Sequence, residues 1–138
     1  MYLNFKYTFE IELPPEQIKY FDFLTKNYDI IYEKYKFESN FYQGKIAVIF
    51  SFSEKDYYYI KPLHKIIDNK IIIIGRDNHP PDVYFACLQE TLIKFNSDKE
   101  FVFFIEKYMG GYDTACKVKI SKSFYEEKPI SEDLLIYI

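Results

Sequence analysis

The chain contains no tryptophan, only four glycines and two cysteines, and no apolar stretch long enough to cross a membrane. A spanning helix needs about 20 mainly apolar residues. The N-terminal segment MYLNFKYTFEIEL alternates polar and apolar residues, which is unlike the continuous apolar block of a signal peptide. We therefore expect a soluble cytoplasmic protein with no membrane segment and no cleaved signal.

The two cysteines, Cys87 and Cys116, lie 29 residues apart and fit neither a metal-binding nor a redox motif. We expect both to be reduced thiols in or near the core, which suits the cytoplasm. The histidines, His64 and His79, are also too few and too far apart in sequence to predict a metal site. The sequence therefore predicts no metal and no cofactor.

No charge of one sign dominates the chain. Eighteen basic residues stand against 21 acidic ones, the formal net charge is −3, and no run of five or more like charges occurs. Nucleic-acid binding draws much of its affinity from a concentrated basic surface. The composition therefore disfavours a nucleic-acid partner.

Aromatic residues are abundant, with 15 tyrosines and 14 phenylalanines among 138 residues. A chain of this size buries about two thirds of its unfolded surface in one core, so we expect a single domain over residues 1–138. Each buried tyrosine hydroxyl needs a hydrogen-bond partner. Several tyrosines should therefore lie on the surface with their rings available for contacts.

Periodicity identifies the first two elements. The odd positions from Leu3 to Leu13 are apolar and the even positions between them are polar, which predicts a strand with one face in water. Pro14 and Pro15 are typical of the first turn of a helix, and that helix should end near Asn27. A second alternating strand is expected around Cys116, Val118 and Ile120.

The middle of the chain is rich in β-forming residues. Segments 29–38 and 45–53 predict an antiparallel hairpin. Segment 54–70 is expected to form a short helix or turn and then an irregular stretch, because Pro62 would break a longer helix. The isoleucines of 71–74 are typical of a central strand that is buried on both faces.

Two consecutive helices should follow the isoleucine strand. In the segment PPDVYFACLQETLIKF, apolar residues recur with helical spacing from Tyr84 to Phe95. Ser97 and Glu100 resemble a capping box, which predicts a second helix that stops at Gly110 and Gly111. These patterns together predict a two-layer α+β domain, in which helices pack on one face of a mainly antiparallel sheet.

One candidate site is the loop GRDNHPPD that follows strand 71–74. Its side chains Arg76, Asp77 and His79 would lie beside a helix N-terminus, where they could hold a phosphate or carboxylate, with His64 as a further candidate. An ordinary strand-to-helix connection explains the same residues and is favoured, because a phosphate-binding loop normally carries several glycines. A nucleophilic role for Cys87 is disfavoured because it lies on the apolar side of its predicted helix.

A second candidate site is a protein-binding surface. Tyr57, Tyr58 and Tyr59 stand among charged residues, and such rings give large contact areas at protein interfaces. An equally weighted interpretation is that two of these rings cover the core. The acidic C-terminal residues Glu126, Glu127 and Asp133 could add contacts to a basic partner, although an ordinary solvated acidic face explains them as well.

Two functional hypotheses follow. The first is a non-enzymatic protein-binding module, for example an inhibitor or a toxin-neutralising immunity protein that occludes a basic toxin or enzyme. The second is a small enzyme or a nucleotide- or anion-binding protein that uses Arg76, Asp77 and His79. The sequence favours the first, because no set of residues forms a convincing catalytic motif.

Overall fold

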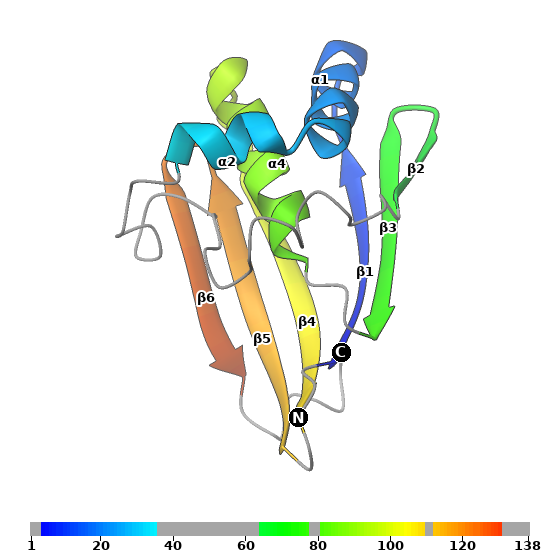
Figure 1. Ribbon diagram of the computed structural model, residues 1–138, viewed down its shortest axis with the longest axis vertical. Coiled ribbons are helices and arrows are strands. Elements are labelled where there is room, and N and C mark those ends of the chain that lie inside the picture. The colour runs from blue at the N-terminus through cyan, green and yellow to red at the C-terminus, as the bar shows by residue number, and fades with distance from the viewer. Residues whose placement is uncertain (1–3, 36–63, 78–80, 110–111, 131–138) are drawn as a thin grey trace.

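Six antiparallel strands form one sheet in the order β2-β3-β1-β4-β5-β6, which confirms the predicted α+β fold. The computed structural model describes residues 4–35, 64–77, 81–109 and 112–130. Figure 1 shows α2 and α4 in front of the sheet, with α1 beside them at one end. The elements are β1 (Asn4–Glu12), α1 (Pro15–Lys26), α2 (Asp29–Tyr35), β2 (His64–Ile67), β3 (Lys70–Asp77), α4 (Asp82–Lys94), β4 (Phe101–Met109), β5 (Tyr112–Ser121) and β6 (Phe124–Ile130).

β1 and α1 form where the sequence predicts them. The odd residues of β1, such as Phe5 and Phe9, are buried beneath the helices, and the even residues are exposed on the opposite face. Pro14 precedes the first turn of α1, and the side chain of Asn27 donates a hydrogen bond to Phe23 C=O at the C-terminal end. The described helices contain no span that is long and apolar enough to cross a membrane.

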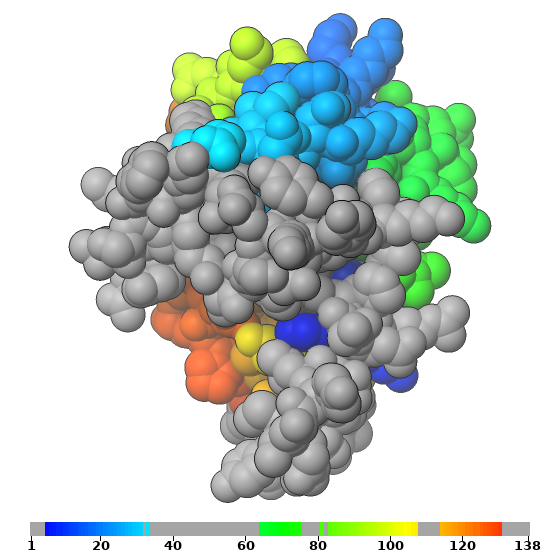
Figure 2. Space-filling view, in the orientation of Figure 1, coloured from blue at the N-terminus to red at the C-terminus, as the bar shows by residue number. Residues whose placement is uncertain are grey.

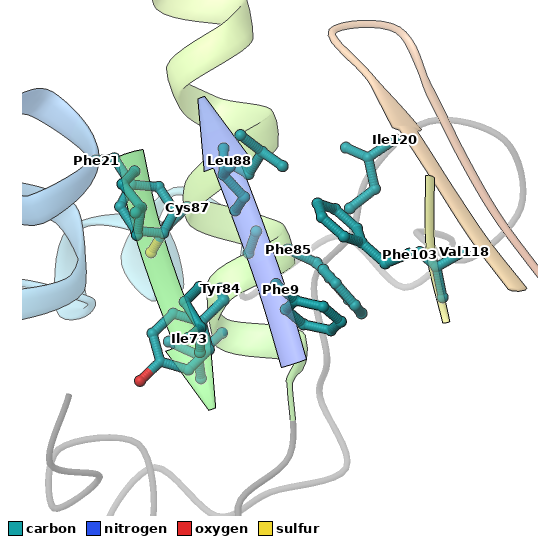
Figure 3. Close-up of a cluster of buried hydrophobic side chains, with 14 of the residues drawn as sticks. Phe9, Phe21, Ile73, Tyr84, Phe85, Cys87, Leu88, Phe103, Val118 and Ile120 are labelled. Atoms are coloured by element: carbon teal, nitrogen blue, oxygen red, sulfur yellow. The ribbon is translucent and has the colours of Figure 1, made fainter. Parts of the chain in front are cut away.

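The core lies between the sheet and the helices. In Figure 3 the rings of Phe9, Phe85 and Phe103 gather between β1, α4 and β4, and their centroids are 4.6 to 5.5 Å apart. α4 is buried on most of its surface, and its Gln89 side chain donates to the carbonyl oxygens of Ser121 and Phe124. This polar contact ties the helix to the turn between β5 and β6.

The prediction of a strand over 29–38 is wrong for residues 29–35, which form α2. Tyr28 and Ile31 are buried and Ile30 is exposed, so the apolar residues follow helical spacing and dock on the core. Tertiary packing therefore overrides the β propensity of this segment.

In Figure 2, α1 and α2 lie next to each other at one end of the molecule, with the β2–β3 hairpin beside α1. Residues 36–53, which include the other predicted hairpin strand, lie outside the described residues.

The prediction of a second helix over 97–109 is also wrong, because residues 101–109 form β4. Phe103 and Ile105 are buried, whereas Val102 and Phe104 are exposed, so the segment follows a period of two. β4 pairs with β5 over its full length, from Phe101 with Ile120 to Met109 with Tyr112. Gly110 and Gly111, which we assigned to a helix stop, lie outside the described residues.

The isoleucine strand is longer than predicted and less buried. β3 continues to Asp77, so Gly75 does not end it. Ile71 and Ile73 are fully buried, but Ile74 is 56% exposed, so only one face of β3 is covered. β3 is second from the sheet edge, because residues 64–67 form the edge strand β2 instead of the irregular segment we expected.

The opposite edge strand, β6, was not predicted from the sequence. Its residues alternate weakly, and Pro129 argues against a central strand. The backbone of Pro129 faces away from β5. The N–H that proline lacks is therefore not needed for a hydrogen bond between the two strands. This placement explains how a proline is accommodated in a paired strand.

Candidate functional site

The structure places two of the three residues of the predicted anion-binding loop. Arg76 and Asp77 are the last two residues of β3, paired with Lys6 and Phe5 of β1, so they do not belong to a loop as we expected. His79 lies outside the described residues. The joint use of these three residues in an anion site therefore stays a prediction.

Of the predicted protein-binding residues, Tyr57, Tyr58, Tyr59 and Asp133 lie outside the described residues. Glu126 and Glu127 are placed on β6, where both carboxylates pair with lysines of the same chain. Glu127 accepts from Lys107, and Glu126 from Lys128. These two carboxylates are therefore parts of ion pairs on the sheet.

Both cysteines are buried free thiols, as predicted. Desolvation raises the pKa of Cys87 well above its ordinary value, and nearby Glu90 raises it further. The pKa of Cys116 is also raised by burial, while Lys107 acts in the opposite direction. Because the thiolate is the nucleophile, neither residue is suited to nucleophilic catalysis in this fold.

His64 belongs to a polar cluster between β2 and α1. Its Nε2 lies 2.7 Å from Asp22 Oδ1, and Lys26 Nζ lies 2.9 Å from Asp22 Oδ2. The His64 side chain is only 4% exposed and packs edge-on against Phe21 and Tyr84. Partial burial would raise the pKa of Asp22, but hydrogen bonds from Lys26 and His64 outweigh it, so the pKa lies below its ordinary value.

This cluster resembles two thirds of a catalytic triad, but within the described part of the chain it is not completed. The His64 Nδ1 atom is buried without a hydrogen-bond partner, so no described nucleophile contacts it. The described residues also contain no group of three side chains that could hold a metal ion. The observed contacts fit a structural role, in which Asp22 and His64 fasten the edge strand to α1.

A more unusual feature is a gap within the sheet between β1 and β4. These strands pair only over Asn4–Lys6 with Glu106–Tyr108, whereas β1 pairs with β3 along its whole length from Phe5 to Glu12. At the other end of the gap, the Lys99 side chain reaches across and donates to Glu12 C=O at 3.3 Å. A long side chain bridges the two segments at a point where a continuous ladder would use backbone groups.

We call this gap the slot. It lies between the Lys6–Glu106 pair and the Lys99–Glu12 bond, and it contains a cavity of about 480 Å³. Pockets of 300–1,000 Å³ are typical of ligand sites. The residues that line the cavity are Lys6, Tyr7, Thr8, Phe9, Glu10, Phe101, Val102, Phe103, Phe104 and Glu106.

Backbone directions identify which groups face the slot. Adjacent residues of a strand direct their N–H and C=O groups to opposite neighbours. Leu13 N–H donates to Asn69 C=O on the β3 side, whereas Glu12 C=O accepts from Lys99 on the β4 side. The odd residues of β1 therefore bond to β3, and its even residues face β4.

The same alternation applies to β4. Glu106 is paired with Lys6 and faces β1, so Phe104 and Val102 face β1 as well. The backbone groups of Thr8 and Glu10 on one wall, and of Val102 and Phe104 on the other, consequently point into the slot. Among the described strands, none pairs with these four residues across the slot.

The side chains give the slot an apolar base and a polar rim. The rings of Phe9 and Phe103 meet beneath it on the helix side, with their centroids 4.6 Å apart. Val102 and Phe104 are 43% and 44% exposed on the opposite face of the sheet, where no described helix lies. We call this the open face. Lys6, Glu10 and Glu106 add charges of both signs.

Sequence reasoning missed the slot because it assigned residues 101–109 to a helix. A strand assignment would have revealed that apolar side chains occupy both faces of this segment, as they do in β3. No protein-family model, curated protein or solved structure matches the chain. The function must therefore be argued from the site itself.

Proposed function

We propose that the chain is a small, non-enzymatic protein-binding module that recognises its partner through the open face of the sheet. The observation that carries this proposal is the slot, because backbone groups of β1 and β4 have no partner there among the described strands and lie beside accessible apolar side chains. Exposed backbone of this kind is a ready template for pairing with another chain.

The apolar side chains of the open face support the same role. Phe104 and Val102 border the slot, and Ile74 lies across it on β3, where all three are substantially exposed. Aromatic and aliphatic residues in the centre of an interface commonly provide most of its binding energy. Surrounding charges, such as Lys117 beside Phe104 in the β4–β5 register, would supply the polar rim of an interface.

The finer form of the proposal is an inhibitor or immunity protein that occludes a basic toxin or enzyme in the cytoplasm. The net charge of −3 and the two free thiols support it. The open face carries both lysine and glutamate side chains, so its charge alone does not select a basic partner. The location of the binding face and the charge of the partner are therefore tested separately.

Site-specific photo-crosslinking tests the binding face in the cells that make the protein. A benzoyl-phenylalanine introduced at Phe104 should give one defined crosslinked product, and excess unlabelled protein should compete it away. The matched control is the same label at Phe23, which is similarly exposed at 47% but lies on α1. Equal products from both positions, or none from position 104, would contradict the proposed face.

A further inference from the structure

We propose that the slot accepts one extended peptide segment of the partner protein, which bonds to the backbone of both β1 and β4. The inference rests on the proposed function and specifies how the partner is held. Its basis is hydrogen-bonding complementarity, because Thr8, Glu10, Val102 and Phe104 present N–H donors and C=O acceptors along the two walls. A peptide backbone carries both kinds of group at strand spacing.

The chemistry of the slot also indicates which side chain such a peptide would carry. The rings of Phe9 and Phe103 form an apolar base on the helix side of the slot, whereas Val102 and Phe104 lie on the open face. One aliphatic side chain of the peptide, directed to the helix side, would contact the two rings of the base. The neighbouring side chains of the peptide would point to the open face beside Val102 and Phe104, because successive residues of a strand alternate.

The charges around the slot favour a peptide over a polyanion. Lys6 lies at one end, and the carboxylates of Glu10 and Glu106 lie on opposite walls. Glu10 already pairs with Lys70 at 2.9 Å, so the charge of this wall is largely balanced. A phosphate chain would find no concentrated positive charge here, whereas a neutral peptide backbone needs none.

Titration of the purified protein with the capped peptide acetyl-Thr-Leu-Thr-amide tests the inference. The amide NMR signals of the four wall residues should shift and saturate together. The matched control is the same peptide with N-methylated amides, which keeps the side chains and removes the donors. Each lost donor should weaken binding about fivefold, since a net hydrogen bond contributes roughly 1 kcal/mol.

A variant of the protein tests the same geometry from the other side. Thr8→Pro removes an N–H that faces the slot, so the protein should fold and bind the peptide about fivefold more weakly. If this variant does not fold, the comparison of the two peptides still tests whether backbone hydrogen bonds hold the peptide in the slot. Lack of saturable shifts at the wall residues, or equal affinity for both peptides, would overturn the inference.

The result is distinguishable from a failure of the proposed function. Position-specific crosslinking at Phe104 without peptide binding would mean that the partner uses the open face and leaves the slot empty. Concentration-dependent changes at the wall residues without peptide, together with a doubled molecular mass, would mean that a second copy of the chain occupies the slot. Either outcome would contradict the inference that a peptide segment of the partner occupies the slot, and would identify the alternative.

Discussion

The phenol ring of Tyr7 lies directly over Gly75, its partner across the β1–β3 ladder. A Cβ atom at position 75 would lie only 1.9 Å from Tyr7 Cζ, so only glycine fits beneath the ring in this position. The ring also stacks on Phe9, with a centroid distance of 4.7 Å. Gly75 therefore fixes how the first aromatic residues of β1 pack, directly next to the slot.

We expect Gly75→Ala to destabilise the protein by about 1–3 kcal/mol, because the added methyl group must displace the ring of Tyr7. Urea unfolding measures this loss. In the double variant with Tyr7→Leu the two effects should not add, since both changes act on one contact. Ile74→Ala, at the exposed neighbouring position, should change stability little. An equally small effect of Gly75→Ala would contradict the described packing.

The two cysteines should react slowly with a thiol reagent in the native protein and rapidly after denaturation. Burial keeps both thiols protonated and inaccessible, and Cys116 is the less deeply buried of the two. Cys116 should therefore be modified before Cys87 in the folded state. Peptide mapping after timed labelling measures the order, and rapid modification of Cys87 would contradict its place in the core.

The Asp22–His64 contact should make a contribution to stability that disappears in acid. The folded-state pKa of Asp22 is lowered, so its stabilising contribution is present above the unfolded pKa of about 4 and is lost as the pH falls through the folded pKa. Asp22→Ala should cost about 1–3 kcal/mol at neutral pH, because His64 Nε2 loses its buried partner. The difference from wild type should shrink below about pH 4.

Asp98→Ala is the control for this prediction. Asp98 also pairs with a lysine, Lys122, but its side chain is almost fully exposed. Exposed ion pairs contribute little, so this variant should unfold like the wild type at every pH. A constant difference between wild type and Asp22→Ala from pH 7 to pH 3 would argue against a stabilising role for the Asp22 carboxylate.

The sequence predicts correctly the elements that have one solvent-exposed face and one buried face. The polar and apolar residues of β1, β5 and α1 follow a clear period because solvent covers one side of each element. The pattern fails where apolar side chains occur on both sides. In β4, Phe101, Phe104 and Ile105 fit a helical stripe, although the buried residues follow a period of two.

The sequence pattern of β3 differs from its observed burial for the same reason. Its isoleucines indicate burial on both faces, yet Ile74 is exposed on the open face. These two errors fall on strands that border or flank the slot, whereas the error over residues 29–35 falls on α2, which packs on the core. Neither the register of β1 with β4 nor the position of Lys99 could be read from one sequence, because both depend on long-range packing.

Amide hydrogen exchange in the free protein measures whether the slot between β1 and β4 is open, because it reports which strand N–H groups are hydrogen-bonded. In β1 and β4, Tyr7, Phe9, Phe103 and Ile105 bond to neighbouring strands, whereas Thr8, Glu10, Val102 and Phe104 face the slot. We predict that the first set is protected and the second exchanges at least about tenfold faster, as expected for groups without a ladder bond. Uniform protection along both strands would show a closed β1–β4 ladder and contradict the slot.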